Sequence, residues 1–335
     1  MTTESMAGKA RRRVTAAMVA RHAGVSVATV SYVINDAPNQ TIPDATRERV
    51  WVAVRELDYT PSAAARALKR GRNDAVLLLL PDWPASLAVS QFVDEVTSSL
   101  AQLGLRLVIE RDRSGSENVW RQLTPVAVLA FGDIANKERE AMTSEGIIVL
   151  QRLVTTSDVA QDTTFSQKAV GAAQVRHLLE RGHRRIGYAG PSDVAMKPFS
   201  ALRMAGAGEV CADEDLPEPI ECLIDADGEG AATAIEVWRQ ASPPVTGVAA
   251  FNDEIAAALL AACRKLAVEV PADLAIVGVD DQPMSQFTDP PLTSVRQDPV
   301  RMAAHVAELV KSQMIDQEML ELQRPAIDLI RREST

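Results

Sequence analysis

Two short helical segments that meet at a glycine near the N-terminus are the feature that most constrains this chain. The apolar face of residues 18–23 ends at Gly24, the residue type that most readily ends a helix. Ser26 suits the N-cap of a second helix over residues 27–34, because its hydroxyl can accept an unpaired backbone N–H of the first turn. Two short helices joined by a glycine-containing turn are typical of the helix-turn-helix, whose second helix enters the DNA major groove.

Charge is divided unevenly along the chain. Residues 1–72 carry 12 Lys/Arg and 6 Asp/Glu, a net charge of +6, whereas the remaining 263 residues carry 23 and 39, a net charge of −16. The overall charge of −10 therefore hides a basic first segment. This asymmetry predicts nucleic-acid affinity in the first segment and argues against it elsewhere.

Several other classes of protein are disfavoured by the sequence. No apolar core follows the basic residues 9–13, and no stretch reaches the 18 or more apolar residues of a membrane span. The cysteines, Cys211, Cys222 and Cys263, lack CxxC spacing, and the four histidines form no HxxxH or HExxH group. We therefore expect reduced thiols and a cytoplasmic protein with no metal and no cofactor. The absence of a glycine-rich phosphate loop after a strand and of a GxSxG motif argues against an enzyme.

The pattern of apolar residues changes at about residue 75. Residues 76–80 form a continuous apolar run ended by Pro81, as expected for a strand buried on both faces of a parallel sheet. After it, predicted strands alternate with predicted helices, which indicates a doubly wound α/β architecture. The further strands are predicted at 106–110, 126–131, 146–150, 185–189, 247–251 and 274–279, and the helices at 91–103, 168–181, 230–240, 253–266 and 299–314.

Seven local motifs in this order resemble the LacI/GalR family of bacterial transcriptional regulators. They are Thr46-Arg47-Glu48-Arg49-Val50, Glu56-Leu57-Asp58-Tyr59-Thr60-Pro61, Gly182-His183-Arg184-Arg185-Ile186, Asn252-Asp253, Val277-Gly278-Val279-Asp280-Asp281, Pro290-Pro291-Leu292-Thr293-Ser294-Val295-Arg296-Gln297 and Arg332-Glu333-Ser334-Thr335. The resemblance implies an N-terminal all-α headpiece and hinge helix, followed by a two-subdomain α/β clamshell like that of periplasmic binding proteins.

The expected domain organisation follows from this resemblance. A disordered basic tail occupies residues 1–10, the helix-turn-helix headpiece 11–60 and the hinge 61–73. The core spans 74–335, with one subdomain at about 75–155 and 296–320 and the other at about 156–295 and 321–335. The headpiece includes a third helix from Pro43 or Asp44 to Leu57.

The resemblance also implies which residues meet DNA. Val27, Ala28 and Tyr32 occupy the base-reading positions of the second helix, although helix packing for Val27 and surface packing for Tyr32 remain open. Phosphate contacts are implied for Thr15, Arg21, Ser26, Thr29, Ser31 and Asn35. In the hinge, Leu68, flanked by Ala65 and Lys69, would wedge into the minor groove of a palindromic operator bound by a dimer. Ordinary interdomain packing is the alternative role for Leu68.

A cleft between the two subdomains would hold a small-molecule effector. Arg203, Asn252 and Asp280 match ligand-contacting positions of the family, unless Arg203 and Asp280 simply pair with each other. Trp83 could provide a stacking surface or pack within its loop. Gln151 and Gln167 stand where the family usually has Asp, and the aromatic platform expected near residues 225–227 is missing.

The sequence therefore predicts a DNA-binding transcriptional regulator, a repressor in most of this family. Its partners would be double-stranded operator DNA, a second copy of the chain and an effector such as a sugar or related metabolite, with no membrane partner. The alternatives are a solute-binding protein of the same clamshell fold and a regulator whose cleft no longer binds a sugar.

Overall fold

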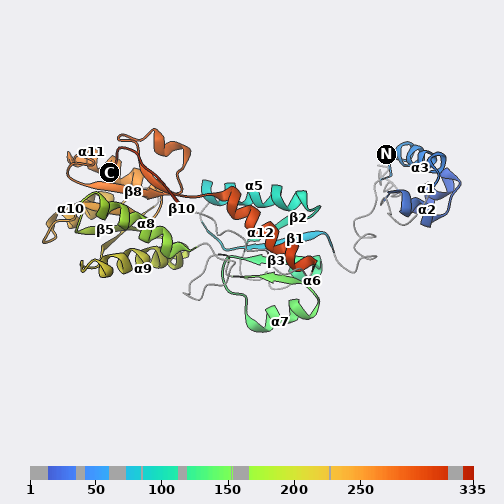
Figure 1. Cartoon of the computed structure of the whole chain (residues 1–335), viewed down its shortest axis with the longest axis horizontal. Helices are drawn as coiled ribbons and strands as arrows, with labels where there is room; N and C mark the ends of the chain where they lie inside the picture. The colour runs from blue at the N-terminus through green and yellow to red at the C-terminus, as the bar shows by residue number, and fades with distance from the viewer. Residues whose placement is uncertain are drawn as a thin grey trace, which may run out of the picture. The chain divides into compact units, whose positions relative to one another are not determined.

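A computed structural model describes residues 14–34, 42–59, 73–83, 86–111, 119–151, 153, 166–225, 228–315 and 327–335. The chain divides into two compact units, residues 1–73 and 74–335. Each is described by itself below, and Figure 1 labels their helices and strands.

The N-terminal unit is built on three helices, α1 (Ala16–Ala23), α2 (Val27–Ile34) and α3 (Asp44–Glu56). Gly24 ends α1 in a left-handed conformation with φ of 67°, and the Ser26 hydroxyl accepts the backbone N–H of Thr29 at 3.1 Å. One valine from each helix is fully buried in the shared core: Val19, Val30 and Val50. The helix-turn-helix predicted from the glycine and the serine cap is confirmed.

Within the described residues, no single helix has both the length and the apolar character needed to cross a membrane. Only α1 and α2 taken as a pair meet such a test by length and composition, and they are bent by 102° at their junction.

A four-stranded parallel sheet begins the second unit. Its strands are β1 (Ala75–Leu80), β2 (Arg106–Arg111), β3 (Ala127–Ala130) and β4 (Ile148–Leu150), in the order β2-β1-β3-β4. Val76 and Leu78 point to a core shared with α5 (Leu87–Gln102) and α12 (Pro299–Met314), whereas Leu77 points to α6 (Val119–Leu123) and α7 (Asn136–Ser144). Burial on both faces therefore accounts for the unbroken apolar run.

A six-stranded sheet follows, in the order β10-β9-β8-β7-β5-β6. Its strands are β5 (Ile186–Pro191), β6 (Ile220–Ile224), β7 (Gly247–Ala250), β8 (Ala275–Val279), β9 (Thr293–Gln297) and β10 (Ile327–Ile330), of which only β10 is antiparallel to its neighbour. One face packs on α8 (Gln167–Glu180) and α9 (Lys197–Asp213), and the other on α10 (Ala231–Gln240) and α11 (Asp253–Leu266). Short 3-10 turns, η1 (Val194–Met196) and η2 (Pro283–Gln286), follow β5 and β8.

The chain passes between the two sheets more than once. It leaves the first after β4, builds β5 to β9 in the second, and then returns to place α12 against α5. It enters the six-stranded sheet again as β10. Arg296 and Gln297 pair with Asp328 and Ile327 in this sheet, so the crossing to α12 comes after Gln297. The doubly wound α/β architecture predicted from the alternating segments is confirmed, and two sheets of this kind can open a cleft at the carboxyl ends of their strands.

Candidate functional site

The outer face of α2 carries the three residues predicted to read bases. Val27 is 50% exposed, Ala28 is exposed and Tyr32 is half-buried, whereas Val30 and Val33 of the same helix lie in the core. This face is free of core contacts at Val27 and Ala28, so these two side chains are available to a major groove.

The predicted phosphate-contacting residues fall into two groups. Thr15, Arg21 and Ser26 are exposed, and Thr29 and Ser31 are half-buried. The Ser26 hydroxyl lies 2.9 Å from the Thr29 hydroxyl and also caps α2, so it supports the turn between the helices. Asn35, Ala65, Leu68 and Lys69, the other predicted DNA contacts, lie outside the described residues.

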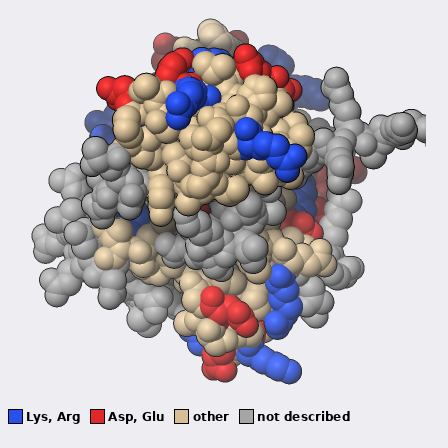
Figure 2. Space-filling model, turned by 90° about the vertical axis from the view of Figure 1, so that its right-hand side faces the viewer, with Lys and Arg blue, Asp and Glu red and all other residues tan. Residues whose placement is uncertain are grey.

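The described part of this unit carries no net excess of positive charge. It contains four arginines (Arg21, Arg47, Arg49 and Arg55) and four acidic residues (Asp44, Glu48, Glu56 and Asp58). On the face of the molecule that Figure 2 presents, the described Lys and Arg lie in small groups separated by neutral surface. The charge of +6 carried by residues 1–72 therefore comes from the eight Lys and Arg of residues 9–13 and 66–72, less Glu4 and Asp36.

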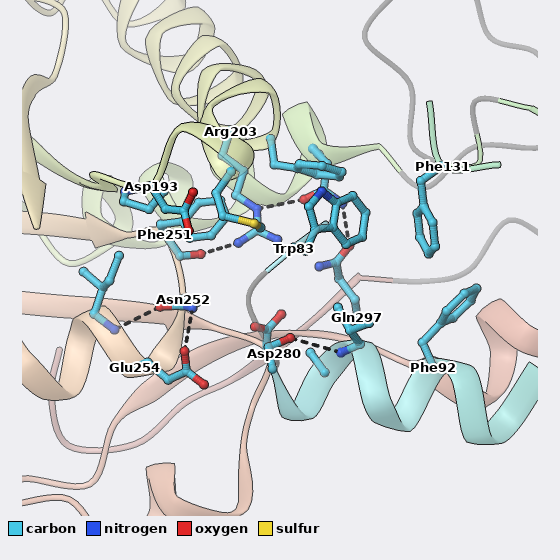
Figure 3. A pocket seen from close by; sticks show the side chains of 18 of the residues that line it. Trp83, Phe92, Phe131, Asp193, Arg203, Phe251, Asn252, Glu254, Asp280 and Gln297 are labelled. Carbon is cyan, nitrogen blue, oxygen red and sulfur yellow. Dashed lines mark hydrogen bonds between the residues drawn. The ribbon is translucent and has the colours of Figure 1, made fainter. Parts of the chain in front are cut away.

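In the second unit, the four residues predicted to contact an effector come together at one pocket. Trp83 follows β1, Arg203 lies in α9, and Asn252 and Asp280 follow β7 and β8. The cavity has a volume of about 200 Å³ and lies at the carboxyl ends of strands from both sheets (Figure 3). Ligands of α/β proteins bind at such ends.

Arg203 reaches this pocket from a buried position and is only 6% exposed. Its Nε donates to Gln167 Oε1 at 2.8 Å, its Nη1 donates to the carbonyl oxygen of Phe251, and its guanidinium carbon lies 4.4 Å from the centre of the Phe251 ring. Burial lowers the pKa of Arg203, and the nearby Asp280 carboxylate opposes that shift. The guanidinium is therefore held by groups of this chain before any ligand arrives.

Asp280 has a different environment. Burial raises its pKa, and the positive charge of Arg203 opposes the rise. The described residues donate no hydrogen bond to its carboxylate, and no ion pair joins it to Arg203. Direct pairing of the two side chains, the alternative raised from the sequence, is thus not how the pocket is built, and the Asp280 carboxylate is available to a ligand.

Asn252 serves the helix that follows it. Its Oδ1 accepts the backbone N–H of Ile255 at 2.9 Å, which caps α11, and its Nδ2 donates to Glu254 at 3.3 Å. Asn252 lines the pocket, but both ends of its amide already have partners.

Aromatic side chains supply much of the remaining wall. Trp83 meets Phe131 and Phe199 edge to face, at 4.7 Å between ring centres in both pairs. Both roles considered for Trp83 are therefore present, because it packs against its neighbours and also lines the cavity. Sequence reasoning missed four phenylalanines at this pocket, Phe92, Phe131, Phe199 and Phe251. Phe92 lies in α5 and Phe199 in α9, whereas Phe131 and Phe251 directly follow β3 and β7. The sequence signal for Phe131 and Phe251 was their place at the end of a predicted strand.

The two glutamines that replace expected aspartates lie in different environments. Gln167 begins α8, lines the pocket and links Arg203 to Gln297, to whose Oε1 its Nε2 donates at 3.0 Å. Gln151 lies away from the cavity wall and accepts the backbone N–H of Ile134 at 3.2 Å.

Behind Asp280, a buried carboxylate holds the loop in place. Asp253 is fully buried and accepts hydrogen bonds from the hydroxyls of Ser285 and Ser294 and from the backbone N–H of Gln282. Desolvation raises the pKa of Asp253 to about 6, although these three bonds favour its charged form. The loop backbone, with φ of 100° at Asp280 and 49° at Asp281, is thus anchored to the first turn of α11.

The described residues contain no group of three or more His, Cys, Asp or Glu side chains arranged to hold a metal ion. No disulfide joins the three cysteines; Cys211 and Cys263 are buried and Cys222 is half-buried.

Comparison with known proteins shows which family has this arrangement of helix-turn-helix and pocket. Residues 18–62 match the family described as bacterial regulatory proteins, lacI family, and residues 175–335 match a periplasmic binding protein-like domain. The HTH-type transcriptional regulator CelR of Thermobifida fusca is 30% identical over 317 residues, which cover 90% of this chain and 92% of CelR. The chain belongs to the LacI/GalR family. It is a DNA-binding transcriptional regulator, and the solute-binding alternative is set aside.

Other members of the LacI/GalR family are similar over nearly the whole chain. The HTH-type transcriptional repressor PurR of Vibrio atlanticus is 26% identical over 313 residues, covering 90% of this chain and 92% of PurR. A crystal structure of the Lac repressor bound to ONPG in the repressed state superposes with a TM-score of 0.79 at 25% identity, covering 97% of this chain and 100% of that one. The CelR–cellobiose complex superposes with a TM-score of 0.62 at 26% identity, covering 96% of this chain and all of the other.

Proposed function

We propose that this regulator binds a palindromic DNA site as a homodimer and that a small molecule in the pocket of the second unit changes its affinity for that site. The observation that carries the proposal is the presence, in one chain, of a helix-turn-helix and of a pocket whose Asp280 carboxylate and Arg203 guanidinium lie at strand carboxyl ends. Among the similar structures, one is a Lac repressor dimer bound to operator and another is a CelR–cellobiose complex. In this proposal the protein is a repressor that acts in the cytoplasm.

Specific contacts are proposed residue by residue. Val27, Ala28 and Tyr32 would contact base edges, and Thr15, Arg21, Ser26, Thr29, Ser31 and Asn35 would contact phosphates. Leu68, between Ala65 and Lys69, would enter the minor groove at the centre of the site, where unstacking costs a few kcal/mol and the kink permits further contacts. Arg203 and Asp280 would hold the effector.

Selection from a random double-stranded DNA library tests the DNA half of the proposal. We expect the full-length protein to enrich a two-fold symmetric sequence of roughly 14–20 base pairs, because the half-sites of such dimers lie about one or more helical turns apart. Leu68→Ala should weaken binding to the enriched site at least tenfold and leave non-specific binding unchanged. Enrichment of an asymmetric site would contradict the dimer, and unchanged affinity would contradict the hinge contact.

A separate titration tests the effector half. A panel of sugars and related metabolites is added to the protein–DNA complex, and the affinity for DNA is measured by fluorescence anisotropy. We expect at least one compound to change the affinity of the wild type and to act much more weakly on Asp280→Asn. A compound that acts equally on both proteins binds elsewhere.

A further inference from the structure

The two sides of the pocket differ in chemistry. Residues from the unit's four-stranded half are apolar, among them Trp83, Val89, Phe92, Phe131 and Met302. Ser86 is the one polar residue on that side within the described chain, and its hydroxyl accepts the backbone N–H of Val89 as the cap of α5. This wall thus offers a ligand aromatic edges and faces, and few hydrogen bonds.

The polar side chains come from the six-stranded half. Gln167, Arg203, Asn252, Glu254, Asp280 and Gln297 all line the cavity from that side. Figure 3 shows Phe92 and Phe131 at one side of the view and Asn252 and Glu254 at the other, with Trp83 and Asp280 between them. A ligand that fills the space therefore meets hydrogen-bonding groups together with the Phe199 and Phe251 rings on the six-stranded side, and almost only hydrocarbon on the other.

The charges of the polar side disfavour an anion. Arg203 is the one cation in the described wall, and two of its donors are already bonded to Gln167 and to the Phe251 carbonyl. Asp193, Glu254 and Asp280 line the same cavity, so carboxylates outnumber the guanidinium. A phosphate or carboxylate group would meet repulsion there, whereas a hydroxyl can donate to Asp280 and accept from the Gln297 amide.

Cavity size limits the ligand further. At about 200 Å³ the space lies below the 300–1,000 Å³ typical of drug-sized ligands. Trp83 meets Phe131 and Phe199 edge to face, so aromatic rings cluster in this part of the wall.

From these walls we propose that the pocket takes a compact, neutral ligand in which a hydroxyl-bearing ring is joined to a flat apolar or aromatic group. The hydroxyls lie against Asp280 and Gln297, and the flat group packs among Trp83, Phe92 and Phe131. This inference rests on the proposed function, because it specifies the chemical class of the effector. A free hexose or pentose leaves the aromatic wall unfilled, and a sugar phosphate places an anion beside the carboxylates.

Matched sets of probes test the inference on the full-length protein by calorimetry and thermal shift. One set is glucose, phenyl β-D-glucoside and glucose 6-phosphate; a second is galactose with its phenyl glycoside and 6-phosphate; a third is ribose, adenosine and adenosine 5′-monophosphate. In at least one set we expect the aryl or nucleoside member to bind about tenfold or more tightly than the free sugar, since burial of one ring contributes that much. The phosphate of that set should bind more weakly than its neutral partner.

Two variants and one control distinguish the contribution of the apolar wall to binding from that of the polar wall. Phe131→Leu keeps an apolar side chain but removes the ring, and should reduce the preference for the aryl member over the free sugar. Asp280→Asn should weaken both members together and keep their ratio. Phe287→Leu, at a side chain that is 79% exposed and does not line the pocket, should change neither.

Three results would overturn the inference: a free sugar that binds as tightly as its aryl partner, a preferred phosphate, or no binding in any of the sets. None of these touches DNA binding, which the library selection measures without ligand. Failure of that selection, in turn, leaves the preference among probes measurable, so the two failures are distinguishable.

Discussion

Gly171 in α8 lies directly against the backbone of Arg203 in α9, so closely that a β-carbon at position 171 would stand 1.9 Å from the Arg203 carbonyl oxygen. The contact is repeated along the crossing, because a β-carbon at Gly206 would stand 1.9 Å from the carbonyl oxygen of Lys168. Two glycines thus allow the backbones of the helices to touch. Since Arg203 also bonds Gln167 at the first residue of α8, this crossing fixes the position from which the guanidinium reaches the pocket.

Substituting Gly171 with alanine should therefore destabilise the second unit. The new methyl group forces α8 and α9 apart, and overpacking of this kind costs about 1–3 kcal/mol of the free energy of unfolding. Gly208→Ala is the matched control, because Gly208 lies in α9, the other helix of the crossing, with no atom within 4 Å of its added β-carbon. Alanine there should raise the free energy of unfolding by roughly 0.5–1 kcal/mol. Urea denaturation measures both; a change of the same sign in the two variants would contradict the role of the crossing.

The same crossing shows why sequence reasoning reached only part of the fold. The headpiece helices were predictable from their apolar periodicity, a glycine and a serine cap. The strand at residues 76–80 was predictable from its continuous apolar run. Helix α9 was not predicted, because its inward face includes Ser200, Arg203 and Gly206 instead of large apolar residues. Strand β9 was missed for a related reason: Thr293 and Ser294 are buried, but they are polar, and their partners Ser334 and Asp253 lie about 40 residues away in sequence.

The candidate pocket was predictable in its polar residues and not in its walls. Arg203, Asn252 and Asp280 belong to short motifs or follow apolar runs that read as strands. The aromatic platform expected near residues 225–227 is missing, and the aromatic content of the chain is only 4%. Four of the six phenylalanines nevertheless line this one cavity. Only the packing of the four-stranded half against the six-stranded half brings residues as distant as Phe92 and Phe251 to one cavity, and no local sequence pattern predicts that.

Titration of Asp253 should make stability depend on pH. The ordinary pKa of an aspartate is 3.8, and burial raises the pKa of Asp253 in the folded protein to about 6. The folded state then holds this proton more tightly than the unfolded chain does, so the stability that Asp253 contributes is complete below pH 3.8 and is lost as the pH rises through 6. At about 1.4 kcal/mol for each pH unit, the loss across this window is roughly 3 kcal/mol.

Asp253→Asn isolates this effect, because the amide oxygen can still accept from Gln282 and Ser285 while the side chain no longer titrates. We expect the free energy of unfolding of the wild type, relative to the variant, to fall between pH 3.8 and about 6. Chemical denaturation at several pH values gives this difference directly. Parallel pH profiles for the two proteins would show that Asp253 is charged throughout.

Salt dependence should report on the basic segments that flank the headpiece. The described helices are electrically balanced, so the net positive charge that attracts phosphates lies in residues 9–13 and 66–72. Each phosphate contact adds about 0.9 to the slope of log K against log salt concentration. Replacing Arg11, Arg12 and Arg13 together with glutamine should lower that slope by up to about 3. Arg55→Gln is the control, because Arg55 already pairs with Glu48 at 3.1 Å, and an equal effect from it would contradict the assignment.

Tyr32 offers the sharpest test of base reading in α2. It lies half-buried beside the exposed Val27 and Ala28, so contact with a base and packing against the headpiece are both geometrically open to it. If it reads a base, Tyr32→Ala should cost about 1–3 kcal/mol of specific binding, relax the preference at one base pair in each half-site and leave non-specific affinity unchanged. Binding-site selection with both proteins shows the lost preference, and Tyr32→Phe tests whether the hydroxyl or the ring is read. Equal losses of specific and non-specific affinity, together with a lower melting temperature, would instead assign Tyr32 to packing.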